Sequence, residues 1–256
     1  MEKKKIIIAY YAGIKNTIIF WDLILKNKDL IEKIYELSII PKKEGRINRR
    51  FFKNLFLSKL IFKIFLFWIS FGYNFFGKRS IKKLCKKLKI KHEKINSINQ
   101  VKLKKKQYLI ASIPEIIPKE FLSKYKNVLI PHEGEMPQWR GSALYFHYLL
   151  SKEKYAYSTL FYPTIDLDKA KKIYCKSKPI KIKGNSVVSL WYKLIYANSK
   201  NVELFFNNLR NNKFIIKNIN IKKKIKPFTF PNCLDFQNLK ERKKIFCNFK
   251  DLKFLT

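Results

Sequence analysis

The sequence predicts an α/β protein with a mostly parallel, Rossmann-like sheet and helices on both faces. Two observations favour this class. As far as Pro163, apolar runs of strand length alternate with stretches of helical period, the order expected of βαβ units. The chain has 256 residues, 47% of them hydrophobic, which is enough for one substantial core. The alternation then weakens, which divides the chain into an α/β domain, 1–212, and a short extended and helical C-terminal tail, 213–256.

The first elements follow directly from local pattern. The run KIIIAYYAG predicts a buried strand ending in a turn at Gly13. Helical spacing over 16–27 predicts a helix that Asn16 or Thr17 caps. Further elements are expected in this order: a strand at 34–40, a basic loop at 41–50, a helix at 81–90 capped by Ser80, and a strand at 107–113.

The later elements lead up to one unusual stretch. A helix should open with Pro118 at its first position, where the missing N–H costs nothing. The remaining expected elements are a strand at 126–131, a helix at 142–151 with Ser142 near its start, a strand at 155–163, a helix at 186–210, an extended segment at 212–232 and a short charged helix in the last 25 residues. Ligands of such sheets bind beyond the carboxyl ends of the strands, where 131–141 begins.

The charge of the chain has two readings. A net charge of +38 suggests an acidic partner such as nucleic acid or an anionic membrane. However, 49 of the 56 basic residues are Lys and only 7 are Arg, and Ile and Asn are abundant, which is typical of AT-rich codon usage. A protein selected for phosphate recognition would use more Arg, because its planar fork pairs bidentately. Genome bias is therefore the favoured source of the charge.

Compartment and membrane contact can be argued from three features. The four cysteines lie far apart without zinc-site spacing, so no metal is expected. The apolar run at the start is too short for a signal peptide, so we expect a cytoplasmic protein. Segment 55–77 is strongly apolar, but its charge-free part, 64–77, is shorter than the ~20 residues of a membrane span. Burial is favoured, and peripheral membrane contact through snorkelling lysines is the alternative.

The stretch PHEGEMPQWRG, 131–141, gathers scarce residue types: one of three His, two of seven Gly and one of seven Arg. Its His, Pro and Arg-Gly resemble, at the same spacing, the fingerprint of the folate-dependent formyltransferases, which act on methionyl-tRNA, glycinamide ribonucleotide or nucleotide sugars. LIASIPEIIPKEFL upstream and YSTLFYPTIDLDKA downstream are similar to the family's folate-binding and catalytic segments. The piece FTFPNCLDFQNLKERKKI resembles a tail found in some members.

The resemblance implies roles for individual residues. His132 and Asp168 match the catalytic pair, in which the carboxylate orients the imidazole and the imidazole donates to the formyl oxygen. The resemblance also implies 10-formyltetrahydrofolate as the formyl donor. The positions implied for binding substrate or cofactor are Ile116, Ile117, Pro137, Arg140, Gly141 and Thr159.

The sequence departs from the family pattern at three positions. The catalytic Asn falls on Ile130, which cannot donate a hydrogen bond, and two glycines become Tyr157 and Ala170. Losing one oxyanion donor typically costs ~10² to 10³ in rate. Glu133 and Glu135 are additional carboxylates that either bind a cationic amine, act as a base or face water.

Three functions follow. The first is an N-formyltransferase for an amine, an amino sugar on a nucleotide being favoured over tRNA because the tail is too short for a C-terminal barrel. The basic loop 41–50 keeps tRNA open as an acceptor. The second is a catalytically impaired relative that serves as a binding or regulatory protein. The third is a basic binder of nucleic acid or of a membrane surface, whose binding would fall steeply with salt.

Overall fold

A large sheet forms the centre of the protein. The structure is a computed structural model and describes residues 5–38, 80–113, 116–164, 172–213, 217–218, 227–228, 231, 233–242 and 251. Eight strands of this described part form the sheet in the order β10-β8-β7-β5-β4-β1-β2-β3. Five are parallel: β1 (Ile6–Tyr11), β2 (Ile31–Leu37), β3 (Lys91–Ile95), β4 (Tyr108–Ser112) and β5 (Val128–His132). The others are antiparallel: β7 (Thr159–Tyr162), β8 (Lys172–Lys176) and β10 (Lys217–Asn218).

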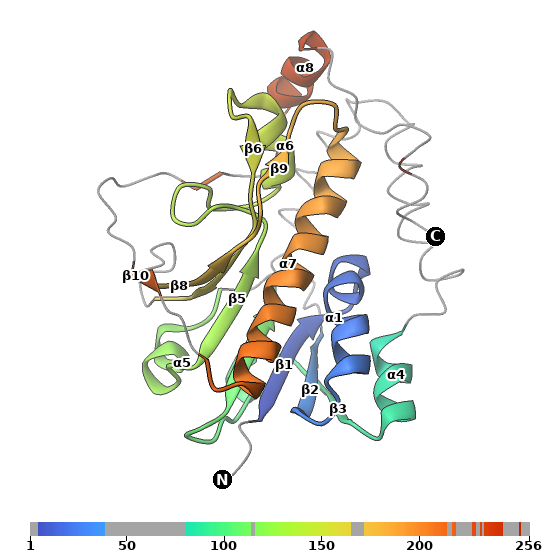
Figure 1. The fold of residues 1–256 in the computed structure, drawn as a ribbon, viewed down its shortest axis with the longest axis vertical. Coiled ribbons are helices and arrows are strands. Elements are labelled where there is room, and N and C mark those ends of the chain that lie inside the picture. The colour runs from blue at the N-terminus through green and yellow to red at the C-terminus, as the bar shows by residue number, and fades with distance from the viewer. Residues whose placement is uncertain are drawn as a thin grey trace.

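Helices cover both faces, which confirms the predicted fold class. On one face, α1 (Ile14–Lys26) and α7 (Val187–Arg210) lie side by side, with α4 (Ile81–Leu88) next to α1 (Figure 1). On the other face lie α5 (Lys119–Lys124) and the 3₁₀ turn η1 (Ile98–Gln100). Three elements lie toward the end of the molecule opposite the N-terminus: α6 (Leu144–Leu150), α8 (Cys233–Glu241) and a two-stranded sheet of β6 (Tyr155–Ala156) and β9 (Ile180–Lys181) (Figure 1).

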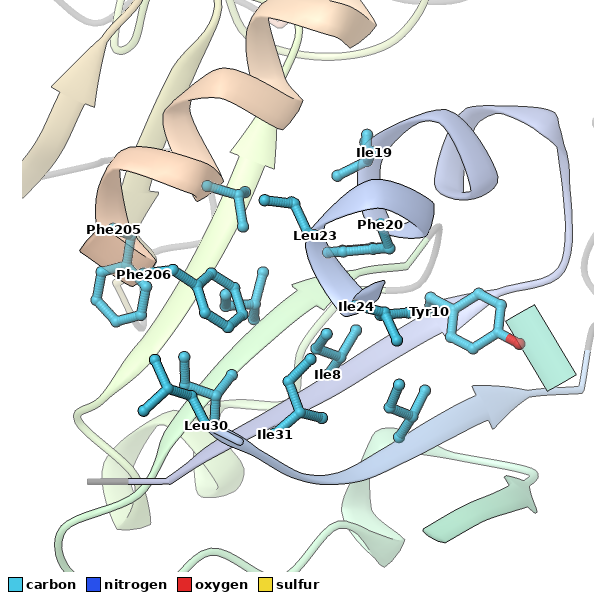
Figure 2. Packing of buried hydrophobic residues seen from close by; sticks show 14 of the residues in the cluster. Ile8, Tyr10, Ile19, Phe20, Leu23, Ile24, Leu30, Ile31, Phe205 and Phe206 are labelled. Atoms are coloured by element: carbon cyan, nitrogen blue, oxygen red, sulfur yellow. The ribbon is translucent and has the colours of Figure 1, made fainter. Parts of the chain in front are cut away.

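The core explains why the first strand is apolar throughout. β1 lies between β2 and β4 and is covered on both faces, so its residues alternate between two cores. Ile8 and Tyr10 face α1 and α7, whereas Ile7 and Ala9 face α5. Figure 2 shows side chains of α1 and α7 converging over Ile8 and Ile31; those labelled on the helices are Ile19, Phe20, Leu23, Ile24, Phe205 and Phe206.

Several predicted boundaries are wrong for identifiable reasons. α1 begins at Ile14 and follows Gly13, so Asn16 and Thr17 lie inside its first turn and do not cap it. Instead, the Thr17 hydroxyl donates to the Gly13 carbonyl oxygen at 3.1 Å. The strand expected at 155–163 is two strands, β6 and β7, which belong to different sheets. The short lysine-rich strand β3 was not expected, because its residues are mostly exposed at the sheet edge and carry no apolar run.

Other predictions hold. Ser80 caps α4, its hydroxyl accepting from the Lys83 amide at 3.4 Å. The helix predicted at 186–210 is α7, and Ser186 caps it. Both the basic loop 41–50 and the apolar segment 55–77 lie outside the described residues. Among the helices that the structure describes, none combines the length and apolar character needed to cross a bilayer.

Candidate functional site

The site lies where β1, β4 and β5 end at the same edge of the sheet. The chain leaves β1 through α1 toward β2, whereas β4 lies on the other side of β1, so the strand order reverses between β1 and β4. Such a reversal is where ligands of open α/β sheets bind. The Asn16 amide nitrogen joins the two strand ends, donating to the carbonyl oxygens of Tyr11 at 2.9 Å and Ser112 at 3.2 Å. This buried bridge holds the two strand ends in place beneath the site.

His132 is the last residue of β5, and the loop that follows orients its ring. Its Nε2 lies 2.9 Å from the carbonyl oxygen of Trp139. Because a carbonyl only accepts, Nε2 must carry the hydrogen, and in the neutral ring Nδ1 is the acceptor. The imidazole also meets the edge of the Phe161 ring at a centroid distance of 6.0 Å. Ile130, two residues earlier, lies on the same face of the strand and packs with Phe161 and Met136.

The loop after His132 is fixed from below by Thr159, which pairs with His132 across the antiparallel ladder. The Thr159 hydroxyl donates to the Gly134 carbonyl oxygen at 2.6 Å and accepts from the Met136 amide at 3.3 Å. A Cβ on Gly134 would lie 2.3 Å from the Trp139 carbonyl oxygen, so this position needs glycine. Thr159 is fully buried in the described structure, and its contacts assign it to holding the loop.

A segment from the C-terminal region closes the far end of this loop. The Phe228 amide donates to the Arg140 carbonyl oxygen at 2.8 Å, and the Ser142 amide donates to the Phe228 carbonyl oxygen at 3.0 Å. Gly141 between them has φ +103°, and a Cβ there would lie 2.0 Å from that same carbonyl. Gly141 therefore serves both the backbone conformation and the close approach of Phe228.

Aromatic rings pack around Trp139. Its indole stacks with Tyr148 at a centroid distance of 3.8 Å and with Phe228 at 4.9 Å. The Tyr148 hydroxyl accepts a hydrogen bond from the Glu135 amide at 3.2 Å, which ties α6 to the loop. Phe228 also lies 4.8 Å from the ring of His147. These contacts favour packing, rather than stacking on a ligand, as the role of Trp139.

The two glutamates of the loop form ion pairs. Glu133 lies 2.5 Å from Lys15 Nζ, in the first turn of α1, and Glu135 lies 2.6 Å from Lys176 Nζ on β8. Burial opposes the charge of Glu133, but Lys15 and His132 outweigh it and lower the pKa of this carboxyl. Burial likewise disfavours the Lys15 ammonium, and Glu133 outweighs it and raises the pKa of Lys15. The edge of the sheet next to His132 therefore carries a fixed pair of opposite charges.

The other predicted site residues differ in burial, and one of them lies outside the described residues. Asp168 lies outside the described residues, so its predicted pairing with His132 stays a prediction. Ile117 is buried in the core on the α5 face, whereas its neighbour Ile116 is 68% exposed at the carboxyl edge. Pro137 and Arg140 are buried within the loop, and the peptide bond before Pro137 is cis.

Two contributors to the site, Lys15 and Phe228, were not predicted from the sequence. Lys15 and Phe228 have no motif of their own; only their position after β1 and the resemblance of the tail pointed near the site. Away from this site, at the β3 edge of the sheet, His92 Nε2 lies 3.3 Å from a carboxylate oxygen of Glu36 and 3.1 Å from the Tyr10 hydroxyl oxygen. Its hydrogen bond is the largest of the effects that lower the pKa of Glu36 to about 2, against the opposing effect of burial.

Comparison with known proteins distinguishes sequence from fold. No protein-family model matches the sequence, and no curated protein matches it. Solved structures do match. WlaRD, a sugar 3N-formyltransferase crystallised with dTDP and 5-N-formyl-THF, is 15% identical with a TM-score of 0.60, over 90% of this chain and 71% of that one.

Two further solved structures, of formyltransferases with different acceptors, are similar in fold to this chain. An N-formyltransferase from Helicobacter canadensis, in complex with folinic acid and dTDP-3-aminofucose, is 13% identical with a TM-score of 0.58, over 89% of this chain and 71% of that one. Phosphoribosylglycinamide formyltransferase from Anaplasma phagocytophilum is 10% identical with a TM-score of 0.54, over 89% of this chain and 99% of that one. The chain therefore has the fold of the sugar and phosphoribosylglycinamide formyltransferases.

Proposed function

We propose that this protein is an N-formyltransferase that moves the formyl group of 10-formyltetrahydrofolate to the amine of a nucleotide-linked amino sugar. The observation that carries the proposal is His132, held by the Trp139 carbonyl at the carboxyl end of β5 in a chain with this fold. The sugar acceptor is supported by the similar structures crystallised with dTDP or dTDP-3-aminofucose and a formylated folate.

The residues present suit the chemistry. The donor would supply a formyl carbon that an amine attacks, and negative charge would develop on the formyl oxygen. Breaking the bond from the formyl carbon to the folate nitrogen would then release tetrahydrofolate, whose nitrogen takes up the proton that the amine loses. In its charged form, His132 donates through both ring nitrogens, so Nδ1 can stabilise that oxygen while Nε2 remains bonded to Trp139. Asp168, as the partner implied by the resemblance, would favour the charged ring and accept the amine proton. Glu133 and Lys15 add a fixed dipole at the same edge.

An exposed apolar side chain, that of Ile116, offers a contact for the formyl donor. Ile116 follows β4 at the carboxyl edge and exposes 68% of its surface, against 43% for Leu25 and 45% for Leu204. A flat bicyclic ring system would cover such a side chain favourably. We therefore assign Ile116 to contact with the donor, and Ile117, which is buried, to support of that segment. Pro137, Arg140, Gly141 and Thr159 shape the loop that carries His132.

The test is transfer of a formyl group by the purified protein. With 10-formyltetrahydrofolate and a dTDP-linked amino sugar, we expect a formylated sugar detectable by mass spectrometry. His132→Ala and Asp168→Ala should each lower kcat by ~10² to 10⁴, the usual contribution of a general acid or base. Tyr196→Ala, an exposed residue of α7, is the control and should retain activity. Equal rates for His132→Ala and the unsubstituted protein would refute the proposal.

Ile130 favours a second candidate, an impaired relative that binds folate and the sugar nucleotide without turnover. Its side chain packs with Met136 and Phe161 where the family's catalytic Asn would donate. Stoichiometric binding of 5-formyltetrahydrofolate without product would identify this case. The described residues lend no support to tRNA as acceptor or to membrane contact through 55–77.

Two further expectations remain part of the proposal. We propose that the protein is located in the cytoplasm, since the formyl donor and a nucleotide sugar are intracellular metabolites. We also propose that the α/β domain ends at residue 212 and that the C-terminal tail begins at residue 213. Phe228 and α8 contact the loop and α6, so the tail 213–256 would then act as part of the site rather than as a separate body.

A further inference from the structure

We propose that Phe228 is a positioning residue that sets the tautomer and orientation of His132 through Trp139. The kinetic part of this inference rests on the proposed function, whereas the structural part does not. Phe228 lies 96 residues after His132 in the chain, as the difference of their numbers shows, yet its backbone pairs with the end of the loop that His132 begins.

The first step is the bond from His132 to the loop. Its Nε2 lies 2.9 Å from the Trp139 carbonyl oxygen. Because a carbonyl oxygen can only accept a hydrogen bond, Nε2 must carry the hydrogen. As long as the Trp139 peptide keeps its place, the neutral ring is held as the Nε2–H form. If the peptide moves, the bond lengthens and the Nδ1–H form becomes accessible as well.

The second step is what holds the Trp139 peptide. Its amide donates to the Glu135 carbonyl oxygen at 2.8 Å, which closes the turn within the loop. Its indole stacks at a 21° interplanar angle on Tyr148, from α6, and at a 12° angle on Phe228. The next residues run alongside Phe228: Gly141 lies opposite it, and Arg140 and Ser142 on either side are joined to it by backbone hydrogen bonds.

The third step separates the ring of Phe228 from its backbone. The hydrogen bonds to Arg140 and Ser142 use only main-chain atoms and survive a change of side chain. The stack on Trp139 uses the ring, and an aromatic pair contributes about 0.5–1.5 kcal/mol beyond its buried area. Removing the ring therefore loosens the indole while the tail stays attached, and the effect reaches His132 through the Trp139 carbonyl.

The direct test is nitrogen-15 NMR of the histidine rings at a pH where they are neutral. The chain has only three histidines, so the spectrum is simple, and a His132→Gln sample assigns the signals. Unsubstituted protein should show His132 as the Nε2–H tautomer. Phe228→Ala and Phe228→Leu, the second keeping apolar volume, should both show Nδ1–H mixed in. Phe228→Tyr should restore the single tautomer. A pure Nε2–H signal in the folded Ala and Leu variants would overturn the inference.

A kinetic arm tests the consequence for catalysis. Misplacement of a catalytic group by an ångström can cost ~10²-fold, so Phe228→Ala should lower kcat by about 10- to 100-fold with little change in KM for either substrate. The kcat–pH profile should shift as well, and Phe228→Tyr should recover both. Tyr196→Ala is the matched control, because Tyr196 stacks with Tyr192 at a 10° angle on α7, in a ring pair outside the site.

The two arms fail separately. If unsubstituted protein shows no turnover but the NMR behaves as expected, the proposed function fails and the positioning role stands. If turnover is normal and Phe228→Ala changes KM alone, or if Phe228→Tyr fails to restore kcat, then Phe228 does not act through His132. Melting temperatures of every variant establish that each measurement is made on folded protein.

Discussion

At the residue scale, the end of β5 holds His132, which matches the formyltransferase fingerprint, and Ile130, which departs from it. His132 and Ile130 lie on one face of the strand, whereas Glu133 pairs with Lys15 at the start of α1. The carboxylate and ammonium each stay charged, because their mutual attraction outweighs the cost of burial. Under the proposed function, Ile130 stands where an oxyanion donor is expected, and its side chain makes an apolar contact instead.

Restoring that donor gives a prediction. Ile130→Asn should raise kcat by up to ~10² to 10³, the usual value of one oxyanion donor, if Ile130 alone limits the rate. Loss of apolar packing against Phe161 and Met136 should lower the free energy of unfolding by about 1–3 kcal/mol. Steady-state kinetics and urea unfolding measure the two effects. Ile130→Val provides the control, since it changes packing without adding a donor. An unchanged kcat in Ile130→Asn would mean that another group already stabilises the oxyanion.

At the scale of elements, the parallel edge of the sheet depends on one polar cluster. Tyr10 of β1 donates to Glu36 of β2 at 3.0 Å, and His92 of β3 lies 3.3 Å from the same carboxylate. Lys94, also on β3, lies 3.5 Å from it. β3 has little apolar surface to bury, so these contacts, together with the Lys33–Glu93 ion pair, attach its polar side chains to β2 and β1.

This cluster should make stability depend on pH. The folded pKa of Glu36, about 2, lies below the ordinary glutamate value of 4.5. The carboxylate therefore contributes stability above about pH 4.5, and the contribution is lost as the pH falls toward 2. Glu36→Gln should lower the free energy of unfolding by about 1–3 kcal/mol at pH 7.

Urea unfolding from pH 7 down to pH 2 measures this difference. The gap between Glu36→Gln and unsubstituted protein should narrow steadily below pH 4.5. Glu153→Gln, at an exposed position after α6, is the control and should show no such gap. A gap that stays constant down to pH 2 would assign the loss to packing rather than to charge.

At the scale of the whole molecule, the site is assembled from distant parts of the chain. Lys15 comes from the start of α1, His132 from β5, Lys176 from β8 and Phe228 from the C-terminal segment. In Figure 1, β5 runs toward α6, and α8 lies beyond α6 at the same end of the molecule. The loop that begins at His132 is thus contacted both by α1, which precedes it in the sequence, and by elements that follow it.

The net charge acts on the whole molecule as well. At a net charge of +38, like charges repel one another in the folded state. Because salt screens this repulsion, its range falls from ~30 Å at 0.01 M NaCl to ~3 Å at 1 M. We therefore expect the melting temperature to rise between these two NaCl concentrations, as measured by differential scanning calorimetry. A parallel series in a neutral osmolyte controls for general solvent effects. A melting temperature that falls with NaCl would show that specific ion pairs outweigh the net repulsion.

How far prediction reached depended on how local each feature is. α4 with its Ser80 cap and the helical period of α7 are encoded within a few residues, and both were predicted, whereas the Ser186 cap was not. β3 was missed because its pattern is polar, and only its pairing with β2 makes it a strand. Thr159 was predicted to bind substrate, but a hydroxyl gives no hint in sequence that it will be buried under Gly134.

Apolar period and motif spacing were enough to predict the fold class, the place of His132 at a strand end and the absence of an amide at Ile130. Periodicity and motif spacing are local properties that survive without knowledge of contacts. The folded chain alone shows that Glu133 meets Lys15, that Glu135 meets Lys176 and that Phe228 packs on Trp139. Those contacts join segments far apart in the chain, and their free energy depends on distances that exist only once the sheet and its helices have packed.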